Sequence, residues 1–169
     1  MNAPVAPPPL AMLAEVTHRC PLACPYCSNP LEMTARNREM TTEQWADIFR
    51  QAAALGVLHL HLSGGEPASR SDLEALTRAG SQAGLYVNLI TSGVGLTQAR
   101  LSALADAGLD HLQLALQGVN PDKADKVGGY KGGFDRKIAV AGWTRDLAVP
   151  LTLNAVFHRS NMEDLPRMI

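Results

Sequence analysis

The sequence lacks the features that mark membrane-spanning, secreted and nucleic-acid-binding proteins. No apolar run in its 169 residues approaches the roughly 20 residues that a helix needs to cross a bilayer. The start, MNAPVAPPPL, has neither the charged nor the apolar region of a secretory signal, and its prolines favour an extended arm. Fifteen basic residues against sixteen acidic ones leave a net charge of −1 without a basic stripe. We therefore expect a cytoplasmic protein with no membrane and no nucleic-acid partner.

Cysteine is also scarce, since the sequence has three cysteines and all of them fall between residues 20 and 27. A disulfide framework uses an even number of cysteines spread along the chain, so this group indicates a metal site instead. Three inert buried thiols are the alternative. The rest of the composition, 46% hydrophobic and 18% charged, is typical of a globular protein. We expect a flexible arm over residues 1–11 and a core domain over residues 12–169.

A short alternating strand, a turn and a helical stretch repeat along the chain. The expected strands are Met12–Thr17, Val57–Leu62, Leu85–Ile90, His111–Leu116 and Leu151–Phe157. The expected helices are Thr42–Ala54, Ser71–Ala83, Thr97–Ala107 and Phe134–Asp146. Strands that alternate with helices indicate a parallel sheet with right-handed crossovers, so the expected fold class is α/β.

The expected strands alternate apolar and polar residues, although parallel strands that are covered on both faces are usually apolar throughout. One face carries Leu58, Leu60, Leu62, Leu85, Val87, Leu89, Leu112, Leu114, Leu116, Leu151, Leu153 and Ala155. The opposite face carries His59, His61, Asn88, Gln113, Gln117, Thr152, Asn154 and His158. In a barrel one face packs on the outer helices and the other lines the lumen, so a polar lumen predicts a ligand cavity. An antiparallel sheet with one exposed face is the alternative, which the long intervening helices disfavour.

Several expected helices carry signals at their ends. Thr41 or Thr42 is expected to cap the first helix, Ser71 with Glu74 forms an expected capping box, and Thr97 opens the third helix.

The C-terminal residues are expected to begin a further helix, because Asn161 is a typical helix N-cap. A chain that stops within the first turns of a helix leaves that helix incomplete. We therefore expect more protein to follow, and a fold that is truncated after about five strand–helix units.

The cysteines form a Cys20-x3-Cys24-x2-Cys27 pattern directly after the first expected strand. Thiolates are soft ligands that select zinc, copper(I) or iron–sulfur clusters. The short spacings let one loop wrap three ligands around a compact cluster, and a four-iron cluster normally takes four cysteines. Three cysteines therefore leave one iron open to another ligand. A zinc site with His18 as the fourth ligand is the alternative, although zinc ligands are usually paired two by two at distant points.

With Tyr26, and with Gly64-Gly65-Glu66-Pro67 after the second expected strand, the cysteine motif resembles the radical S-adenosylmethionine (SAM) superfamily over nearly the whole chain. The resemblance implies a partial (β/α)6 TIM-like barrel and a [4Fe-4S] cluster, whose open iron SAM chelates through its amino and carboxylate groups. An electron from the reduced cluster then cleaves the sulfonium and releases a 5′-deoxyadenosyl radical, which abstracts hydrogen from the substrate.

The resemblance also implies which residues bind SAM. Gly64 and Gly65 let the backbone approach a ligand closely, and the Glu66 carboxylate can pair with the methionine ammonium. Tyr26 can help to seat the adenine, by backbone contact or by stacking. Ser92, at the end of the third expected strand, is placed to bond the ligand.

The chain departs from the superfamily pattern at the end of the fourth expected strand. Many members have a serine-leucine-aspartate-glycine sequence there, whose serine touches the ribose, whereas this chain reads Ala115-Leu-Gln117-Gly118. The serine contact is therefore absent, and Gln117 or Asn154 is expected to replace it.

A narrower resemblance is carried by Cys27-Ser-Asn-Pro-Leu-Glu32 and by Gln113-Leu-Ala-Leu-Gln117. Both are similar to the family of peptide cyclases of pyrroloquinoline quinone biosynthesis. This resemblance implies a glutamate–tyrosine crosslink in the precursor peptide PqqA, the delivery protein PqqD, a flavodoxin-like electron donor, and a C-terminal SPASM domain with auxiliary iron–sulfur clusters. No cysteine follows Cys27, so that domain is expected outside this chain.

Two other functions stay open from the sequence. One is another SPASM-type radical enzyme, of sulfatase maturation or of a heme pathway. The other is a non-catalytic metal-binding or redox-sensing module.

Overall fold

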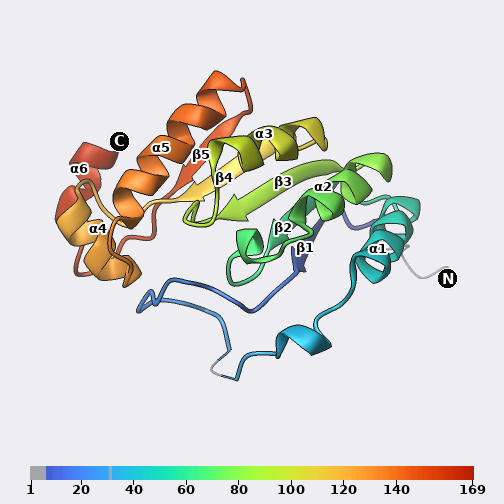
Figure 1. Cartoon of the computed structure of the whole chain (residues 1–169), viewed down its shortest axis with the longest axis horizontal. Coiled ribbons are helices and arrows are strands. Elements are labelled where there is room, and N and C mark those ends of the chain that lie inside the picture. The colour runs from blue at the N-terminus through green and yellow to red at the C-terminus, as the bar shows by residue number, and fades with distance from the viewer. Residues whose placement is uncertain (1–6, 31) are drawn as a thin grey trace, which may run out of the picture.

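Five parallel strands form one sheet in the order β1-β2-β3-β4-β5, in a computed structural model that describes residues 7–30 and 32–169 (Figure 1). The strands are β1 (Ala11–Glu15), β2 (His59–Ser63), β3 (Tyr86–Thr91), β4 (His111–Ala115) and β5 (Leu151–Asn154). The expected α/β fold, part of a TIM-like barrel, is confirmed, and the antiparallel alternative is wrong. Residues 1–6 of the expected arm, and Leu31 of the narrower motif, lie outside the described residues.

Helices connect the strands, and in Figure 1 α1, α2, α3 and α5 lie along one side of the sheet. The helices are α1 (Thr42–Ala54), α2 (Leu73–Gln82), α3 (Gln98–Asp106), α4 (Pro121–Gly128), α5 (Gly133–Asp146) and α6 (Leu165–Met168), and 3-10 turns lie at Arg36–Arg38, Pro67–Ser69 and Met162–Asp164. The first helix has the predicted bounds, and the other three predicted helices differ only at their ends. Within the described ranges, no helix has the length and apolar character that a bilayer span requires.

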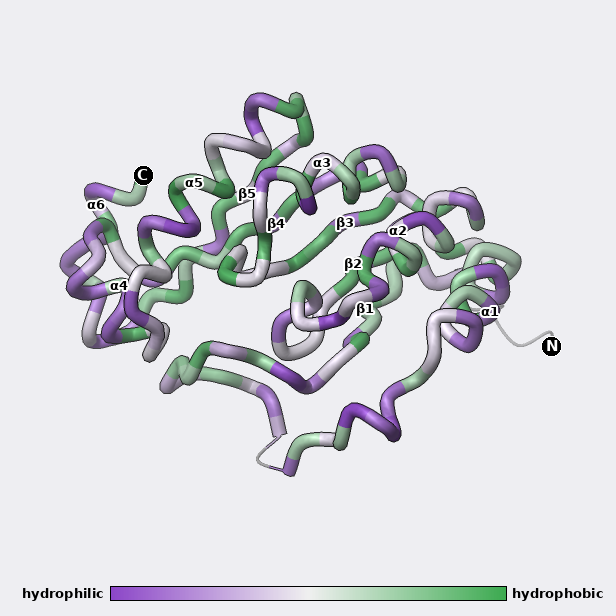
Figure 2. Tube along the Cα trace, viewed as in Figure 1, coloured by the Kyte–Doolittle hydropathy of each residue, from purple (hydrophilic) through white to green (hydrophobic). Residues whose placement is uncertain are grey.

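The apolar face of the sheet packs against these helices. The buried core contains Leu60, Leu62, Val87, Leu89, Leu112 and Leu114 from the strands, and Phe49, Leu73, Leu76, Leu101, Leu104 and Val140 from the helices. Figure 2 shows the same hydrophobic stretches along the strands. Leu58 is 57% exposed and Leu153 is 53% exposed, so their predicted places in the core are wrong. Leu58 lies just before β2, and Leu153 lies on β5, an edge strand with a paired neighbour on one side only.

Side-chain caps begin α1 and α3. The Thr41 hydroxyl accepts a hydrogen bond from the Gln44 amide, and the Gln44 side chain accepts one from the Thr41 amide, which completes a capping box. Thr97 accepts in the same way from the Arg100 amide. The predicted caps of both helices are therefore confirmed, with Thr41 rather than Thr42 at the first.

The helix start predicted at Ser71 is wrong. Asp72 is the N-cap residue of α2, and it makes no side-chain cap bond. Its carboxylate instead accepts two hydrogen bonds from the Arg70 guanidinium. A charge-assisted pair of this kind is stronger than a neutral cap bond, which explains why the local capping signal of Ser71 and Glu74 does not decide the helix end.

The helix α4 was not predicted, although its ends carry recognisable signals. Asn120 is its N-cap and accepts a hydrogen bond from the Lys123 amide at 3.0 Å. Pro121 occupies the first turn, where it has no amide hydrogen to leave unpaired. Gly129 ends the helix with a left-handed φ of 63°.

Candidate functional site

A cavity of about 280 Å³ lies at the carboxyl ends of the strands. Its lining consists of Cys20, Leu22, Cys24, Tyr26, Cys27, Ser28, Asn29, Ser63, Gly64, Gly65, Ile90, Thr91, Ser92, Ala115, Gln117, Asn154 and Val156. Every residue predicted for the site is in this lining except Glu66. The carboxyl ends of the strands are where TIM-like barrels build their active sites, so the cavity is the candidate site.

Gly64 and Gly65 bring the turn after β2 against the cysteine-bearing segment, which we define as residues 16–40. The Gly65 amide donates to the Thr17 carbonyl at 2.7 Å. A Cβ atom on Gly65 would lie 2.5 Å from the carbonyl oxygens of His18 and Arg19, closer than such atoms approach. Gly64 has a φ of +135°, a conformation that side chains disfavour. The two glycines therefore let two protein backbones meet at the edge of the cavity, a role that their sequence did not indicate.

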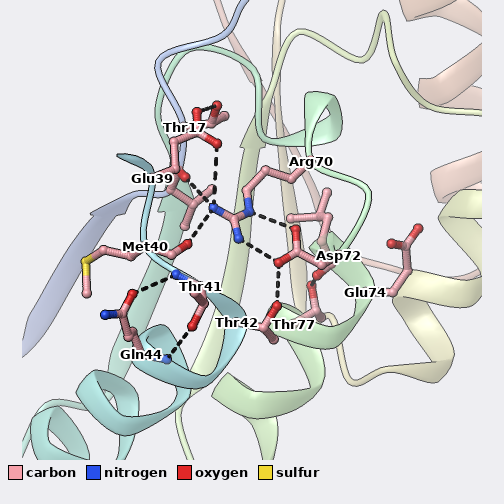
Figure 3. A network of polar contacts seen from close by, with 12 residues as sticks. Thr17, Glu39, Met40, Thr41, Thr42, Gln44, Arg70, Asp72, Glu74 and Thr77 are labelled. Atoms are coloured by element: carbon pink, nitrogen blue, oxygen red, sulfur yellow. Dashed lines mark hydrogen bonds and ion pairs between the residues drawn. The ribbon is translucent and has the colours of Figure 1, made fainter. Parts of the chain in front are cut away.

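Arg70 fixes both ends of the cysteine-bearing segment (Figure 3). Its Nη1 donates to the Val16 carbonyl at 2.9 Å and to the Met40 carbonyl at 3.1 Å. The other side of the guanidinium pairs with Asp72. Arg70 is only 6% exposed, so these bonds are shielded from water. The segment that carries the three cysteines is thus anchored to the turn before α2 at both of its ends.

Glu66 is fully buried and binds the end of β3. Its Oε1 accepts from the Thr91 hydroxyl at 2.6 Å and from the Ala68 amide at 2.9 Å. Its Oε2 accepts from the Ser92 amide at 2.7 Å and from the Ser92 hydroxyl at 2.5 Å. The carboxylate does not line the cavity but orients Ser92, which does. These charge-assisted bonds tie the turn after β2 to the turn after β3.

The three cysteines all line the cavity. Burial raises the pKa of the Cys20 and Cys24 thiols, while Cys27 is exposed. In the described part of the chain, no three His, Cys, Asp or Glu side chains are grouped to hold a metal ion. His18, the fourth ligand of the zinc alternative, accepts at Nδ1 from the Thr34 amide at 3.0 Å. Three soft thiolates that line one cavity fit a multi-iron cluster, in which each thiolate binds a different iron.

Gln117 presents a buried acceptor at the cavity wall. The residue is 2% exposed, and its Oε1 has no hydrogen-bond partner among the described residues. Tyr26 also lines the cavity, and its ring contacts the His158 ring at a centroid distance of 5.2 Å. Burial raises the pKa of the Tyr26 hydroxyl. An unpaired buried acceptor is costly, so the Gln117 amide suits a ligand that brings a hydroxyl or amino donor.

Asn161 was not predicted as a site residue, yet it positions the wall of the cavity. It is fully buried, and its Nδ2 donates to the Gln117 carbonyl at 3.1 Å and to the Val156 carbonyl at 2.9 Å. Its Oδ1 accepts from the His158 amide at 2.7 Å. Asn161 is the N-cap residue of the turn Met162–Asp164, as its residue type predicted, but its side chain makes no cap bond there. The Asn161 side chain instead binds backbone groups of the segment after β5, at Val156 and His158.

Polar strand residues form a hydrogen-bonded row toward the amino ends of the strands. Asn88 on β3 lies 2.9 Å from the His61 ring on β2 and 2.7 Å from the His111 ring on β4. His111 also reaches Thr152 on β5 at 3.0 Å. His61, Asn88 and His111 are direct neighbours in the sheet register. The polar face that the alternation predicted is therefore present, and His61, Asn88 and Thr152 of that face belong to this bonded row.

The Radical SAM superfamily matches residues 14–169 of this chain. The chain therefore belongs to the radical SAM superfamily, as the cysteine and glycine motifs predicted. Membership implies a [4Fe-4S] cluster and SAM as cofactors.

The chain is 68% identical to the PqqA peptide cyclase of Rhizobium meliloti (strain 1021) over 162 residues, which are 96% of this chain and 43% of that protein. It is 67% identical to the PqqA peptide cyclase of Ruegeria pomeroyi (strain ATCC 700808 / DSM 15171 / DSS-3) over 163 residues, 96% of this chain and 44% of that protein. The chain thus spans less than half the length of these curated relatives. The predicted resemblance to PqqA peptide cyclases is confirmed.

Among solved structures, Streptococcus suis SuiB bound to S-adenosylmethionine superposes with a TM-score of 0.84 at 22% identity, over 95% of this chain and 37% of that chain. Escherichia coli coproporphyrinogen III oxidase superposes with a TM-score of 0.65 at 15% identity, over 95% of this chain and 41% of that chain. At these identities the likeness concerns the fold alone.

Proposed function

We propose that this chain is the SAM-binding core of an enzyme that joins a glutamate and a tyrosine side chain of the precursor peptide PqqA, during pyrroloquinoline quinone biosynthesis. The observation that carries the proposal is the cavity at the strand ends, where three thiols meet the glycine turn and the polar ends of β3, β4 and β5. The identity of 68% to a PqqA peptide cyclase supports the particular reaction.

Cys20, Cys24 and Cys27 would hold a [4Fe-4S] cluster, each through one thiolate. When bound, the cluster supplies the electron that cleaves SAM and releases the 5′-deoxyadenosyl radical. The anchoring of the cysteine-bearing segment by Arg70 keeps the three thiols at the same end of the sheet. The zinc alternative would need His18, whose Nδ1 already accepts from the Thr34 amide.

The polar residues of the wall would bind SAM. Gln117 Oε1 and the Asn154 side chain can accept from the ribose hydroxyls, and the Ser92 hydroxyl, held by Glu66, is the third polar group at this wall. Glu66 then acts through Ser92, because both of its oxygens are occupied by protein donors. Tyr26, packed on His158, would seat the adenine from the side of the cysteine loop.

The substrate would reach the cavity as a peptide. SuiB, whose fold this chain shares with a TM-score of 0.82, has been crystallised with its precursor peptide SuiA. In the proposed reaction one hydrogen atom leaves the peptide to the radical, and a proton and an electron leave as the carbon–carbon bond forms. Auxiliary iron–sulfur clusters outside this chain would accept that electron, PqqD would deliver the peptide, and a flavodoxin-like donor would reduce the first cluster. A reducing compartment such as the cytoplasm suits three free thiols.

The test uses the full-length protein, loaded anaerobically and mixed with SAM, a reductant, PqqA and PqqD. We expect release of 5′-deoxyadenosine and a peptide whose mass is lowered by the hydrogen lost from both joined carbons, with fragmentation mapping the link to one glutamate–tyrosine pair. The Cys24→Ala variant is the negative control. Cleavage of SAM without any change in the peptide would contradict the cyclase assignment, and the absence of SAM cleavage by the loaded protein would favour a non-catalytic metal module.

A further inference from the structure

Lys137 is a lysine in the protein interior, directly behind the cavity. It lies on α5 and is 2% exposed. Its Nζ donates at 3.0 Å to the carbonyl of Ala115, a residue of the cavity wall at the end of β4. None of the ion pairs formed between described residues includes Lys137. Lysines are almost never fully buried without a partner of opposite charge, so we expect an anion near this ammonium.

The charges that act on Lys137 belong to the cavity and its surroundings. Burial lowers the pKa of Lys137 to about 8, and Cys24, Glu66, Cys20 and Asp125 favour its charged form. Two of the four acidic groups are thiols that we propose as cluster ligands. Lys137 binds the Ala115 carbonyl, and Ala115 lines the same cavity as the three thiols.

We infer that Lys137 tunes the reduction potential of the iron–sulfur cluster. Its buried ammonium balances the negative charge of the cysteine-bound cluster and thereby raises this potential. The inference rests on the proposed function, since it needs Cys20, Cys24 and Cys27 as ligands.

The physical reason is the charge change on reduction. A reduced cluster carries one more negative charge than an oxidised cluster, and net charge is one of the factors that set cluster potentials. A fixed positive charge in a poorly solvated site favours the more negative state, because the interaction is weakly screened there. Lys137 also holds the Ala115 carbonyl, so its charge stays in one place relative to the cavity wall.

The test measures the potential of the cluster in the full-length protein, by a redox titration that follows the electron paramagnetic resonance signal altered by SAM. Lys137→Gln removes the charge but keeps a donor for the Ala115 carbonyl, Lys137→Met removes both, and Lys137→Arg keeps the charge. In the first two variants we expect the ratio of reduced to oxidised cluster at a given potential to fall about tenfold. This corresponds to a midpoint potential that is lower by about 59 mV for a one-electron couple. The arginine variant should stay within about twofold of the wild type, since its guanidinium is always charged.

The matched control is Lys131→Met, which removes an exposed lysine from the same part of the chain and should leave the potential unchanged because water screens it. Iron content is measured on every variant. A normal cluster with an unshifted potential in Lys137→Gln would overturn the inference and leave Lys137 as a structural donor to Ala115. A wild-type protein that holds no cluster through its three cysteines would overturn the proposed function, and this inference with it.

Discussion

Arg70 and Asp72 form a two-point ion pair, with Nε 2.9 Å from Oδ1 and Nη2 2.6 Å from Oδ2. The pair orients the guanidinium so that its Nη1 reaches the carbonyls of Val16 and Met40. Two residues in the turn before α2 thereby hold both ends of the cysteine-bearing segment, which begins at β1 and returns to the sheet at α1.

The first prediction concerns acid stability. The Arg70 hydrogen bonds lower the pKa of Asp72 from 3.8 to about 2. Because this pKa is lower in the folded than in the unfolded chain, Asp72 stabilises the fold fully above pH 3.8, and the contribution is lost as the pH falls through about 2. In urea unfolding, the stability difference between the wild type and Asp72→Asn should be constant above about pH 4 and shrink toward pH 2. Asp146→Asn, at an exposed ion pair, is the control and should show no such trend.

The second prediction concerns the contact between backbones at Gly65. Gly65→Ala places a Cβ 2.5 Å from two backbone oxygens that cannot rotate away. We expect a loss of about 1–3 kcal/mol of stability and reduced cluster loading, because overpacking displaces the cysteine-bearing segment. Gly142→Ala, inside α5 with no atom within 4 Å of its Cβ, should stabilise by about 0.5–1 kcal/mol. Equal stabilities for the two variants would contradict this contact.

The third prediction concerns Glu66. Glu66→Gln turns one acceptor oxygen into a donor that faces the Thr91 or Ser92 donors. We expect a loss of about 1–3 kcal/mol of stability in the cluster-free protein. The affinity for SAM should fall on the order of 10- to 100-fold, because the Ser92 hydroxyl is no longer held at the cavity wall. Glu163→Gln, at an exposed position, is the control. An unchanged dissociation constant for SAM would show that neither Glu66 nor its hold on Ser92 contributes to SAM binding.

The fourth prediction separates the cluster from the zinc alternative. Alanine at Cys20, Cys24 or Cys27 should abolish SAM cleavage, because two thiolates hold a four-iron cluster poorly. His18→Ala should retain the cluster and SAM cleavage, since the cluster does not need that imidazole. The measurements are 5′-deoxyadenosine release and the SAM-sensitive paramagnetic signal of anaerobically loaded full-length protein. Wild-type cleavage by any cysteine variant, or loss of the signal in His18→Ala, would refute this ligand assignment.

The sequence by itself determined the features that depend on short spacings and on periodicity. The distances between Cys20, Cys24 and Cys27 along the chain confine the three thiols to one loop. The alternation of strands and helices determined a parallel sheet, and the alternation within the strands determined which face meets the helices. Spacing and periodicity are both local properties of the chain, so they predict these features without knowledge of the rest of the fold.

Only the tertiary structure decided which distant groups share a hydrogen bond or a charge. Glu66 binds Thr91 and Ser92, Arg70 binds the carbonyl of Val16, and Lys137 reaches the carbonyl of Ala115. Each pair is brought together by the crossovers between parallel strands. Their register and packing depend on the whole core, so no local pattern specifies them. The same reason explains Ser71, whose capping signal was overridden by the ion pair of its neighbour Asp72 with Arg70.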